Sequence, residues 1–537
     1  MRRTRFILYF LCASSVLLPA ADEGITWLVR YDGKSLPDST WRAVGDAKAT
    51  LEGGGLRLID DGIGFANFRT AWKPGADDEI IVEATVKVVS VTGSQPEKPA
   101  TSLWPWRDGA PVMVQVSDGR HQEGLVLFPG QAASFTDRFI PMDTTNRFHT
   151  YRLVIRGTDM QMFVDGERKV QGQGAFWKPA DSPEAFLQFG SSAKTATGDA
   201  VWASVRLGVR KPTASLPTSR VKLTVSESWS IPRDEVRQTR PYLYDMGRGL
   251  LLMSVAQGPD ALYEPYGLLK STDAGKTWSP IPGLDQVDTA PLPCVRRADG
   301  SILAASRWTW SQPDGSLLGK TVYLDAGATE FTMIESRIEL PQSYLPEKRG
   351  DVVICERHIW SDEDGGATMV VWSRKSVKLP DGRKRTERWS HLVRSTDEGK
   401  TWKYFSTVGP GGEPAVVRLG PTEQTAVIRG DQNSRMKQMF SHDGGATWTQ
   451  PIELEVGKVL PDLVLMSNGV LACSYGRPAS CLMFSLDGGK TWPAHHVLSD
   501  KVNFNYTSIR EISPGKLLYL HDAPKMNAMT VEVEPVN

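Results

Sequence analysis

Hydrophobic and polar residues alternate with a period of two along the first part of the chain. From 80 to 88 the apolar residues Ile, Val, Ala, Val and Val occupy every second position. The same alternation recurs over 148–156 and 160–164, and an Asp-Gly pair follows at 165–166. Period-two alternation predicts strands with one buried face, and Asp-Gly is preferred in tight hairpin turns. Residues 22–212 are therefore predicted to form an antiparallel β-sandwich.

A repeated octamer dominates the second part of the chain. The pattern Ser-x-Asp-x-Gly-x-Thr-Trp occurs in Ser271–Trp278, Ser395–Trp402, Ser441–Trp448 and Ser485–Trp492, with a degenerate copy in Tyr323–Glu330. In such a turn the Ser and Asp side chains bind backbone N–H groups, and Gly takes a positive φ. The Trp is expected to pack inward. The last three complete copies start 46 and 44 residues apart, about the length of one four-stranded propeller blade.

The repeats predict an all-β architecture for 221–537. Five octamers, together with one sheet closed by both ends of this region, predict six blades of a β-propeller. Residues 213–220 contain a proline and no apolar periodicity, which is typical of a linker. Residues 1–21 combine three early arginines, an apolar run and small residues, as a secretory signal peptide does. The protein is therefore predicted to be exported, to the periplasm, the cell surface or the medium.

Composition excludes several classes of function. Lys+Arg and Asp+Glu both number 62, and this neutral balance argues against a nucleic-acid partner held by phosphate contacts. After the leader, no stretch reaches the roughly 18 apolar residues of a spanning helix. Four cysteines then remain, and their spacing allows either buried thiols or a disulfide. No pair has CxxC spacing, so no zinc site is predicted. Nothing else in the sequence demands a metal, and no cofactor is predicted.

Both parts of the chain resemble known families. The octamer is the Asp-box, and 221–537 resembles sialidases (neuraminidases) and other BNR Asp-box propellers. The stretch from 148 to 169 resembles the laminin-G and concanavalin-like jelly rolls, which implies a carbohydrate-binding or structural module in 22–212. The Asp-box by itself indicates a fold, because it occurs in hydrolases as well as in binding and assembly proteins.

Six residues match the sialidase pattern in the right order along 221–537. They are Arg240, Asp260, Glu413, Arg429, Arg477 and Tyr506. The resemblance implies that the three arginines clamp the carboxylate of the substrate. It also implies that Tyr506 is the nucleophile, that Glu413 takes its proton, and that Asp260 acts first as general acid and then as base.

The chemistry explains why these residue types belong together. Arginine offers planar, permanently charged donors that bind a carboxylate in a bidentate way. A tyrosine nucleophile avoids the repulsion that a carboxylate would meet from an anionic sugar, and it needs an adjacent base because its pKa is near 10. The resemblance thus implies a retaining exo-α-sialidase that acts on sialylated or other acidic glycans.

Three departures from the sialidase pattern leave alternatives open. The motif at Arg240 lacks the isoleucine of the family, and the family's arginine upstream of Asp260 is absent. The stretch 374–388 is basic, which allows a pocket for an acidic sugar other than N-acetylneuraminate. A non-catalytic glycan-binding propeller and a propeller glycosidase or lyase for another acidic sugar therefore remain as alternatives.

Overall fold

The computed structural model describes residues 24–536 with gaps. The gaps are 46–47, 62–64, 76–77, 93–108, 136–138, 158, 173–175, 177, 179, 194–195, 212–220, 232–237, 258–265, 285–290, 313–315, 346–351, 379–383, 431–434, 455, 478, 500, 502–503 and 523–524. The predicted leader, the predicted linker and Asp260 therefore lie outside the described residues. Within the described part the fold is all-β, as the alternation and the repeats predict.

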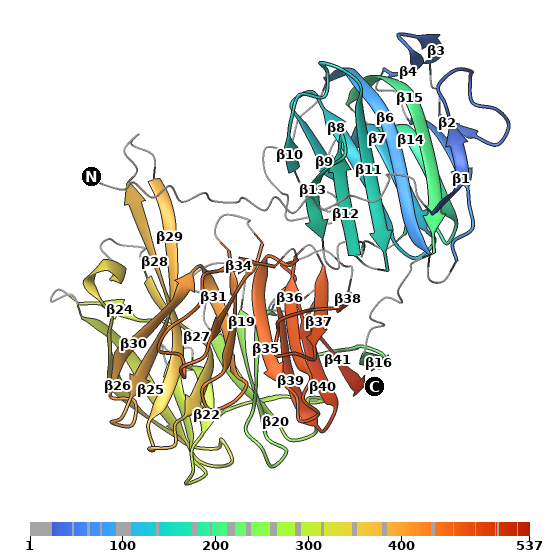
Figure 1. The fold of residues 1–537 in the computed structure, drawn as a ribbon. Helices are drawn as coiled ribbons and strands as arrows, with labels where there is room; N and C mark the ends of the chain where they lie inside the picture. Colours follow the sequence, from blue (N-terminus) through green and yellow to red (C-terminus); the bar gives the residue numbers. More distant parts are fainter. Residues whose placement is uncertain are drawn as a thin grey trace, which may run out of the picture.

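The strands between Ile25 and Arg210 form two sheets that face each other (Figure 1). One sheet has the order β13 (Glu167–Gly172), β12 (Asp159–Val164), β11 (His149–Arg156), β6 (Glu79–Thr92), β15 (Thr197–Arg210), β4 (Gly55–Asp60) and β3 (Lys48–Glu52), and β1 (Ile25–Tyr31) pairs with β15. The other has the order β10 (Phe139–Pro141), β9 (Gln131–Ser134), β8 (Gln122–Phe128), β7 (Gly109–Asp118), β14 (Ala185–Ala193), β5 (Ala66–Ala71) and β2 (Arg42–Gly45).

The alternation along this part of the chain has the predicted structural meaning. The apolar side chains at 80, 82, 84, 86 and 88 are all buried in one core cluster with residues of both sheets. The Asp-Gly pair joins β12 to β13 in a two-residue turn, with φ of 51° at Asp165 and 82° at Gly166. Both central φ values are positive, as a turn matched to the twist of a hairpin requires.

The strands between Val221 and Pro535 form five further sheets, and no described strand pairs with the first two sheets. Three sheets have four strands: β18 (Gln238–Asp245) to β21 (Ser279–Pro280), β31 (Gly412–Arg418) to β34 (Ile452–Glu453), and β35 (Val459–Leu465) to β38 (Ala494–Ser499). Between their end strands lie β19 (Leu251–Gln257), β20 (Tyr266–Ser271), β32 (Gln424–Arg429), β33 (Lys437–Ser441), β36 (Leu471–Gly476) and β37 (Ser480–Ser485).

The remaining two sheets complete six four-stranded units. A nine-stranded sheet joins two units through the parallel pair of β26 and β30. The first of these units has β22 (Pro291–Arg296), β23 (Ile302–Ser306), β25 (Leu317–Leu324) and β26 (Phe331–Glu339), and the short β24 (Trp310–Ser311) pairs with β25. The second has β27 (Val352–Ser361), β28 (Ala367–Lys378), β29 (Lys384–Ser395) and β30 (Thr401–Pro410). The last unit combines β39 (Thr507–Ser513), β40 (Lys516–His521) and β41 (Asn527–Pro535) with β16 (Val221–Val225) and β17 (Trp229–Ser230), and thus joins both ends of this part of the chain.

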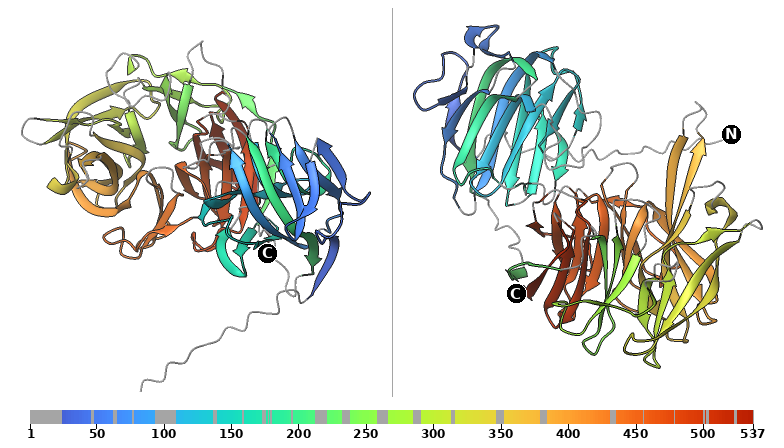
Figure 2. Two further views of the ribbon diagram at one scale, coloured as in Figure 1. Left: turned by 90° about the horizontal axis from the view of Figure 1, so that it is seen from above. Right: turned by 180° about the vertical axis from the view of Figure 1, so that it is seen from behind.

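The first strands of the six units form a closed inner ring. Each of β18, β22, β27, β31 and β35 contacts the first strand of the next unit, and β39 contacts β18. Figure 2 shows the same sheets from above and from behind. Since the strands within a unit are antiparallel, the starts of the first strands and the ends of the second strands lie on one side of this ring.

The octamers form the turns between third and fourth strands, on the other side. In the first copy Ser271 Oγ accepts a hydrogen bond from Gly275 N (3.0 Å), and Asp273 Oδ1 accepts one from Thr277 N (2.9 Å). Gly275 has a φ of 82°, as predicted. The Trp of each complete copy packs inward, as expected, but to different depths: the tryptophans at 402 and 492 are buried, and those at 278 and 448 are half-buried against core clusters. In these two the indole N–H binds the carbonyl of the motif glycine, which keeps the ring at the turn.

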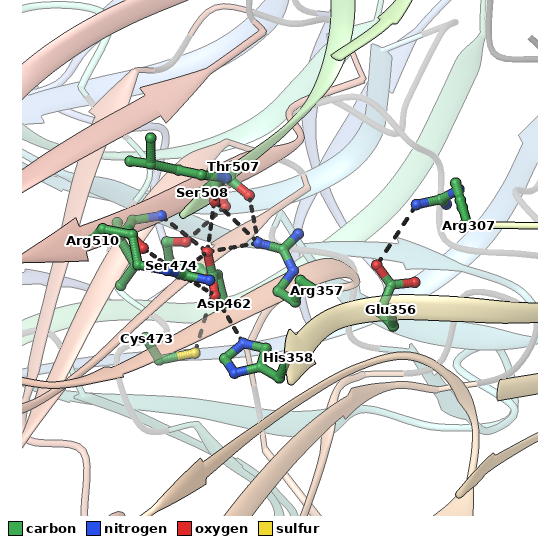
Figure 3. A network of polar contacts seen from close by, with 12 residues as sticks. Arg307, Glu356, Arg357, His358, Asp462, Cys473, Ser474, Thr507, Ser508 and Arg510 are labelled. Carbon is green, nitrogen blue, oxygen red and sulfur yellow. Dashed lines mark hydrogen bonds and ion pairs between the residues drawn. The ribbon is translucent and has the colours of Figure 1, made fainter. Parts of the chain in front are cut away.

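A buried ionic network fastens three of the first strands to one another (Figure 3). Asp462 of β35 is fully buried. Its carboxylate forms ion pairs with Arg357 Nη1 (2.7 Å) and Arg510 Nη1 (2.9 Å). It also accepts hydrogen bonds from His358 Nε2 (3.1 Å), Ser508 Oγ (2.7 Å) and Ile509 N (3.0 Å). Burial raises the pKa of Asp462, but the neighbouring Arg357 and Arg510 outweigh it and hold the pKa well below the usual value. The carboxylate is therefore ionised and ties β27 to β35 and β39.

The four cysteines among the described residues are buried free thiols, so the alternative of a disulfide between them does not apply to the structure. Within the described residues no helix has the length and apolar character needed to cross a membrane.

Candidate active site

Tyr506 stands at the inner ring between two arginines. It directly precedes β39, and its side chain is 1% exposed. Its hydroxyl lies 3.2 Å from Arg477 Nη2. The guanidinium carbons of Arg240 and Arg477 lie 5.1 and 5.2 Å from the centre of the Tyr506 ring. Arg240 belongs to the first unit of the ring, Arg477 to the fifth and Tyr506 to the last, so closure of the ring brings them together.

Glu413 and Arg429 complete the cluster from the fourth unit. Arg429 Nη1 lies 2.7 Å from Glu413 Oε1, and Leu460 N donates a hydrogen bond to Glu413 Oε2 (3.0 Å). Burial raises the pKa of Glu413, but the charges of Arg429, Arg240 and Arg477 outweigh it and lower the pKa to about 2. The Glu413 charge in turn raises the pKa of Arg429. All three arginines thus act on one carboxylate, which is ionised at neutral pH.

Irregular backbone marks the positions of these side chains in the inner ring. Strand pairing shifts by a bulge at Arg240 in β18 and at Glu413 in β31, and comparable shifts interrupt β22, β27 and β35. Arg240, Glu413 and Arg477 have φ values of 52°, 50° and 58°. Such conformations cost non-glycine residues roughly 1–3 kcal/mol each and cluster at functional sites. The backbone strain therefore coincides with three of the six residues that the sequence singled out.

Gly476 allows the segment that carries Tyr506 to lie close to Arg477. A Cβ atom on Gly476 would lie 1.7 Å from the carbonyl oxygen of Asn505, so no side chain fits at this position. Arg477 Nε also donates a hydrogen bond to the carbonyl oxygen of Phe504 (3.0 Å). The turn after β36 is thus fitted to the segment that carries Tyr506.

Asp522 belongs to the site, but sequence reasoning missed it. Its carboxylate accepts hydrogen bonds from the backbone N–H of Tyr506 (2.9 Å) and of Arg240 (3.3 Å), which lie at opposite ends of the second part of the chain. Burial raises its pKa to about 6, although both hydrogen bonds and the nearby arginines oppose the shift. The available signal was its position directly after β40, the hairpin partner of the strand that follows Tyr506.

A further buried carboxylate, that of Glu356, lies where the second and third units meet and forms a wall of the inner ring with Arg307 and Trp372. Trp372 Nε1 donates a hydrogen bond to Glu356 Oε2 (2.8 Å), and Arg307 Nη1 lies 3.8 Å from Glu356 Oε1. The guanidinium of Arg307 also lies 4.9 Å from the centre of the Tyr242 ring, two residues after Arg240. This wall was not predicted, because its residues lie in no motif.

The structure thus gathers five of the six predicted residues. Arg240, Glu413, Arg429, Arg477 and Tyr506 form one cluster, whereas Asp260 lies outside the described residues and its role stays a prediction. At neutral pH three guanidinium groups stand against two ionised carboxylates, Glu413 and Asp522, so the cluster keeps an excess positive charge suited to an anionic ligand. Within the described residues no three His, Cys, Asp or Glu side chains gather as a metal site would require.

Comparison with known proteins adds a family match over part of the chain. Residues 366–518 match the family model of the BNR repeat-like domain, and this range contains three of the four complete octamers. The search of curated proteins found no match.

Several solved structures are similar at low sequence identity. A protein of unknown function from Dyadobacter fermentans DSM 18053 has 19% identity and a TM-score of 0.45, covering 58% of this chain and 99% of that one. The Hadza microbial sialidase Hz136 has 15% identity and a TM-score of 0.44, covering 88% and 98%. The α-L-arabinofuranosidase Arb93A from Fusarium graminearum has 14% identity and a TM-score of 0.40, covering 58% and 98%.

Proposed function

We propose that the protein is an exported, retaining exo-glycosidase that releases a terminal sialic acid or a related carboxylated sugar. The observation that carries the proposal is the convergence of Arg240, Arg429 and Arg477 on Tyr506 and Glu413. In this proposal the closed inner ring is the hub of a six-bladed propeller. Residues 22–212 form a jelly roll that holds the glycan near the site and so raises its effective concentration.

The first chemical step uses the residues of the cluster. The three guanidinium groups bind the sugar carboxylate and place the anomeric carbon over Tyr506. The Tyr506 oxygen attacks this carbon while its proton passes to Glu413. The bond to the leaving oxygen breaks, and that oxygen receives a proton from Asp260. The product of this step is a tyrosyl-linked sugar with inverted anomeric configuration.

The second step reverses the roles. Asp260, now ionised, removes a proton from water, and the water oxygen attacks the anomeric carbon. The bond to Tyr506 breaks, and Glu413 returns its proton to the phenolate oxygen. Two inversions leave the released sugar with its original configuration.

Binding of the substrate itself prepares Glu413 for this task. With a pKa of about 2 in the free site, Glu413 is a weak base, because three arginines stabilise its ionised form. A bound carboxylate offsets these positive charges and therefore raises the pKa of Glu413 toward the value of an ordinary base. Proton transfer from Tyr506 is thus coupled to occupancy of the arginine clamp.

Turnover of an aryl α-sialoside tests the proposal. The wild type should release the fluorophore, and Tyr506→Phe should lower kcat by more than about 10³-fold while a sialic acid analogue still binds. The matched control is Tyr519→Phe, because Tyr519 is also buried but its hydroxyl donates to the carbonyl of Cys481, away from the cluster. An unchanged rate in Tyr506→Phe would refute the nucleophile. Tight binding without turnover by the wild type would favour a glycan-binding protein instead.

A further inference from the structure

The hairpin of β28 and β29 forms an arm beside the candidate site. Its strands run over Ala367–Lys378 and Lys384–Ser395, and Figure 1 shows them extending beyond the neighbouring sheets. They are the second and third strands of their unit. The end of β28 and the start of β29 therefore lie on the same side of the inner ring as Arg429 and Arg477, which end or follow second strands.

The base of the arm contacts the segment that carries Glu413. Gly411 N donates a hydrogen bond to the carbonyl of Arg388 (2.9 Å), and Ser390 Oγ donates one to the carbonyl of Gly411 (2.9 Å). A Cβ atom on Gly412 would lie 2.9 Å from the Trp372 ring and 3.0 Å from Arg388 Cδ. The face of the arm that bears Trp372 and Arg388 is therefore the face turned toward the site.

On this site-facing side of the arm, positively charged residues lie directly opposite each other at two positions along the strands. Alternate positions share a face, so Trp372 and Ser390 are followed outward by the pairs Arg374–Arg388, Ser376–Thr386 and Lys378–Lys384. None of these residues is acidic, and both lysines are exposed. Like charges directly opposite each other in a sheet are destabilising, so folding alone does not favour the exposed pair Lys378–Lys384.

The opposite side of the arm carries less excess charge, because an acidic residue offsets part of it. There Lys375 stands opposite Glu387, and Arg385 forms an ion pair with Glu387 at 2.5 Å. Trp389 packs against Tyr344 with ring centres 5.6 Å apart. Among the described residues of 374–388, four of the six basic side chains thus lie on the side facing the site, and the one acidic side chain lies on the other.

We propose that this face of the arm is a subsite for a second anionic group of an acidic glycan. The proposal rests on the proposed function, because the arginine clamp holds the terminal sugar and the arm meets the sugars that follow it. At about 3.3 Å per residue, the arginine pair stands roughly 7 Å and the lysine pair roughly 20 Å beyond Trp372. Positive charges spaced along a line that starts at the site suit a linear chain carrying carboxylate or sulfate groups.

The double variant Lys378→Glu/Lys384→Glu tests the subsite. Three substrates are compared: an aryl α-sialoside with a neutral leaving group, an oligomer of sialic acid, and a sialylated oligosaccharide bearing sulfate. The ratio of kcat/KM for an anionic chain to kcat/KM for the aryl sialoside should fall about tenfold or more. Its dependence on salt should also weaken, because fewer charges attract the chain. The oligosialic acid and the sulfated substrate distinguish carboxylate from sulfate as the recognised group.

The matched control is Lys276→Glu/Lys490→Glu. These lysines are exposed and lie in Asp-box turns on the other side of the ring, so the variant changes the net charge equally far from the arm. Its substrate ratio should stay within twofold of the wild type. Equal ratios in both double variants, or no change in either, would overturn the subsite. Thermal unfolding of both variants at the wild-type midpoint confirms that the arm variant is folded.

Direct binding separates this proposal from the proposed function. If the wild type cleaves no sialoside, the proposed function fails, and fluorescence anisotropy of a labelled sialic acid oligomer still measures the arm. At least tenfold weaker binding by the arm variant alone supports the subsite. Equal binding by wild type and arm variant, or binding only to vesicles of anionic lipid, overturns it.

Discussion

Replacement of Asp462 by Asn should separate the role of the buried network from that of the catalytic cluster. The Asp462 carboxylate is fully buried and meets Arg357 at 2.7 Å, Arg510 at 2.9 Å and Ser508 at 2.7 Å. Asparagine keeps the shape of the side chain but removes its charge. Arg357, whose side chain is 1% exposed, then loses its ionised partner at 2.7 Å and keeps neutral acceptors, which are the new amide oxygen and two atoms at 3.3 and 3.4 Å.

The structure sets the size of the effect. Removing one partner of a buried ion pair typically costs about 3–5 kcal/mol, because the other charge stays buried without compensation. We expect a loss of this size in the free energy of unfolding of Asp462→Asn at pH 7. The double variant Asp462→Asn/Arg357→Met removes the orphaned charge as well and should recover at least about half of the loss.

Equilibrium urea unfolding followed by tryptophan fluorescence measures this loss. The matched control Glu534→Gln removes an exposed carboxylate paired with Lys222, and should change stability by less than about 0.5 kcal/mol. Because the pKa of Asp462 is lowered by folding, its contribution is fully present above about pH 4 and is lost as the pH falls further. The difference between wild type and Asp462→Asn should therefore be constant from pH 5 to 8 and shrink below pH 4. A loss under about 1 kcal/mol, or one that Arg357→Met deepens, would refute the reasoning.

Three further predictions concern the catalytic cluster. Glu413→Gln should lower kcat for an aryl sialoside by about 10²–10⁴-fold, because it removes the proposed base; a smaller loss in steady-state assays would exclude that role. Gly476→Ala should lower kcat at least tenfold, since its Cβ would lie 1.7 Å from the Asn505 carbonyl, whereas Gly420→Ala meets no atom within 4 Å and should be silent. Burial raises the pKa of Asp522 to about 6, so its carboxylate is protonated as the pH drops below 6 and becomes a weaker acceptor for the Tyr506 N–H. We therefore expect kcat/KM to fall below pH 6, and an acid limb of the pH profile that is unchanged in Asp522→Asn would contradict this.

Features governed by neighbours in sequence were accessible without coordinates. The Asp-box turn follows from side chains that bind backbone groups two to four residues away, as Asp273 and Ser271 do. The hairpin at Asp165-Gly166 follows in the same way from the positive φ that both residues tolerate. These local rules did not predict how deeply each Asp-box Trp is buried, because its burial depends on the neighbouring unit that covers the turn.

The arrangement of the candidate site lies partly beyond such rules. Five residues were found from motifs at fixed places, and closure of the ring then brought them together. Asp462 and Asp522 were missed because their partners lie far away in sequence: Asp462 binds Arg357, and Asp522 binds the backbone of Arg240. The bulges at Arg240 and Glu413 likewise depend on the pairing of adjacent strands.

Covalent labelling of Tyr506 tests the central claim most directly. The protein is incubated with a 2,3-difluorinated sialic acid that slows hydrolysis of a glycosyl-enzyme, digested, and examined by tandem mass spectrometry. The account predicts one added sugar on the peptide that contains Tyr506, and none after Tyr506→Phe. A label on Glu413, or turnover of an aryl sialoside by Tyr506→Phe at the wild-type rate, would contradict it.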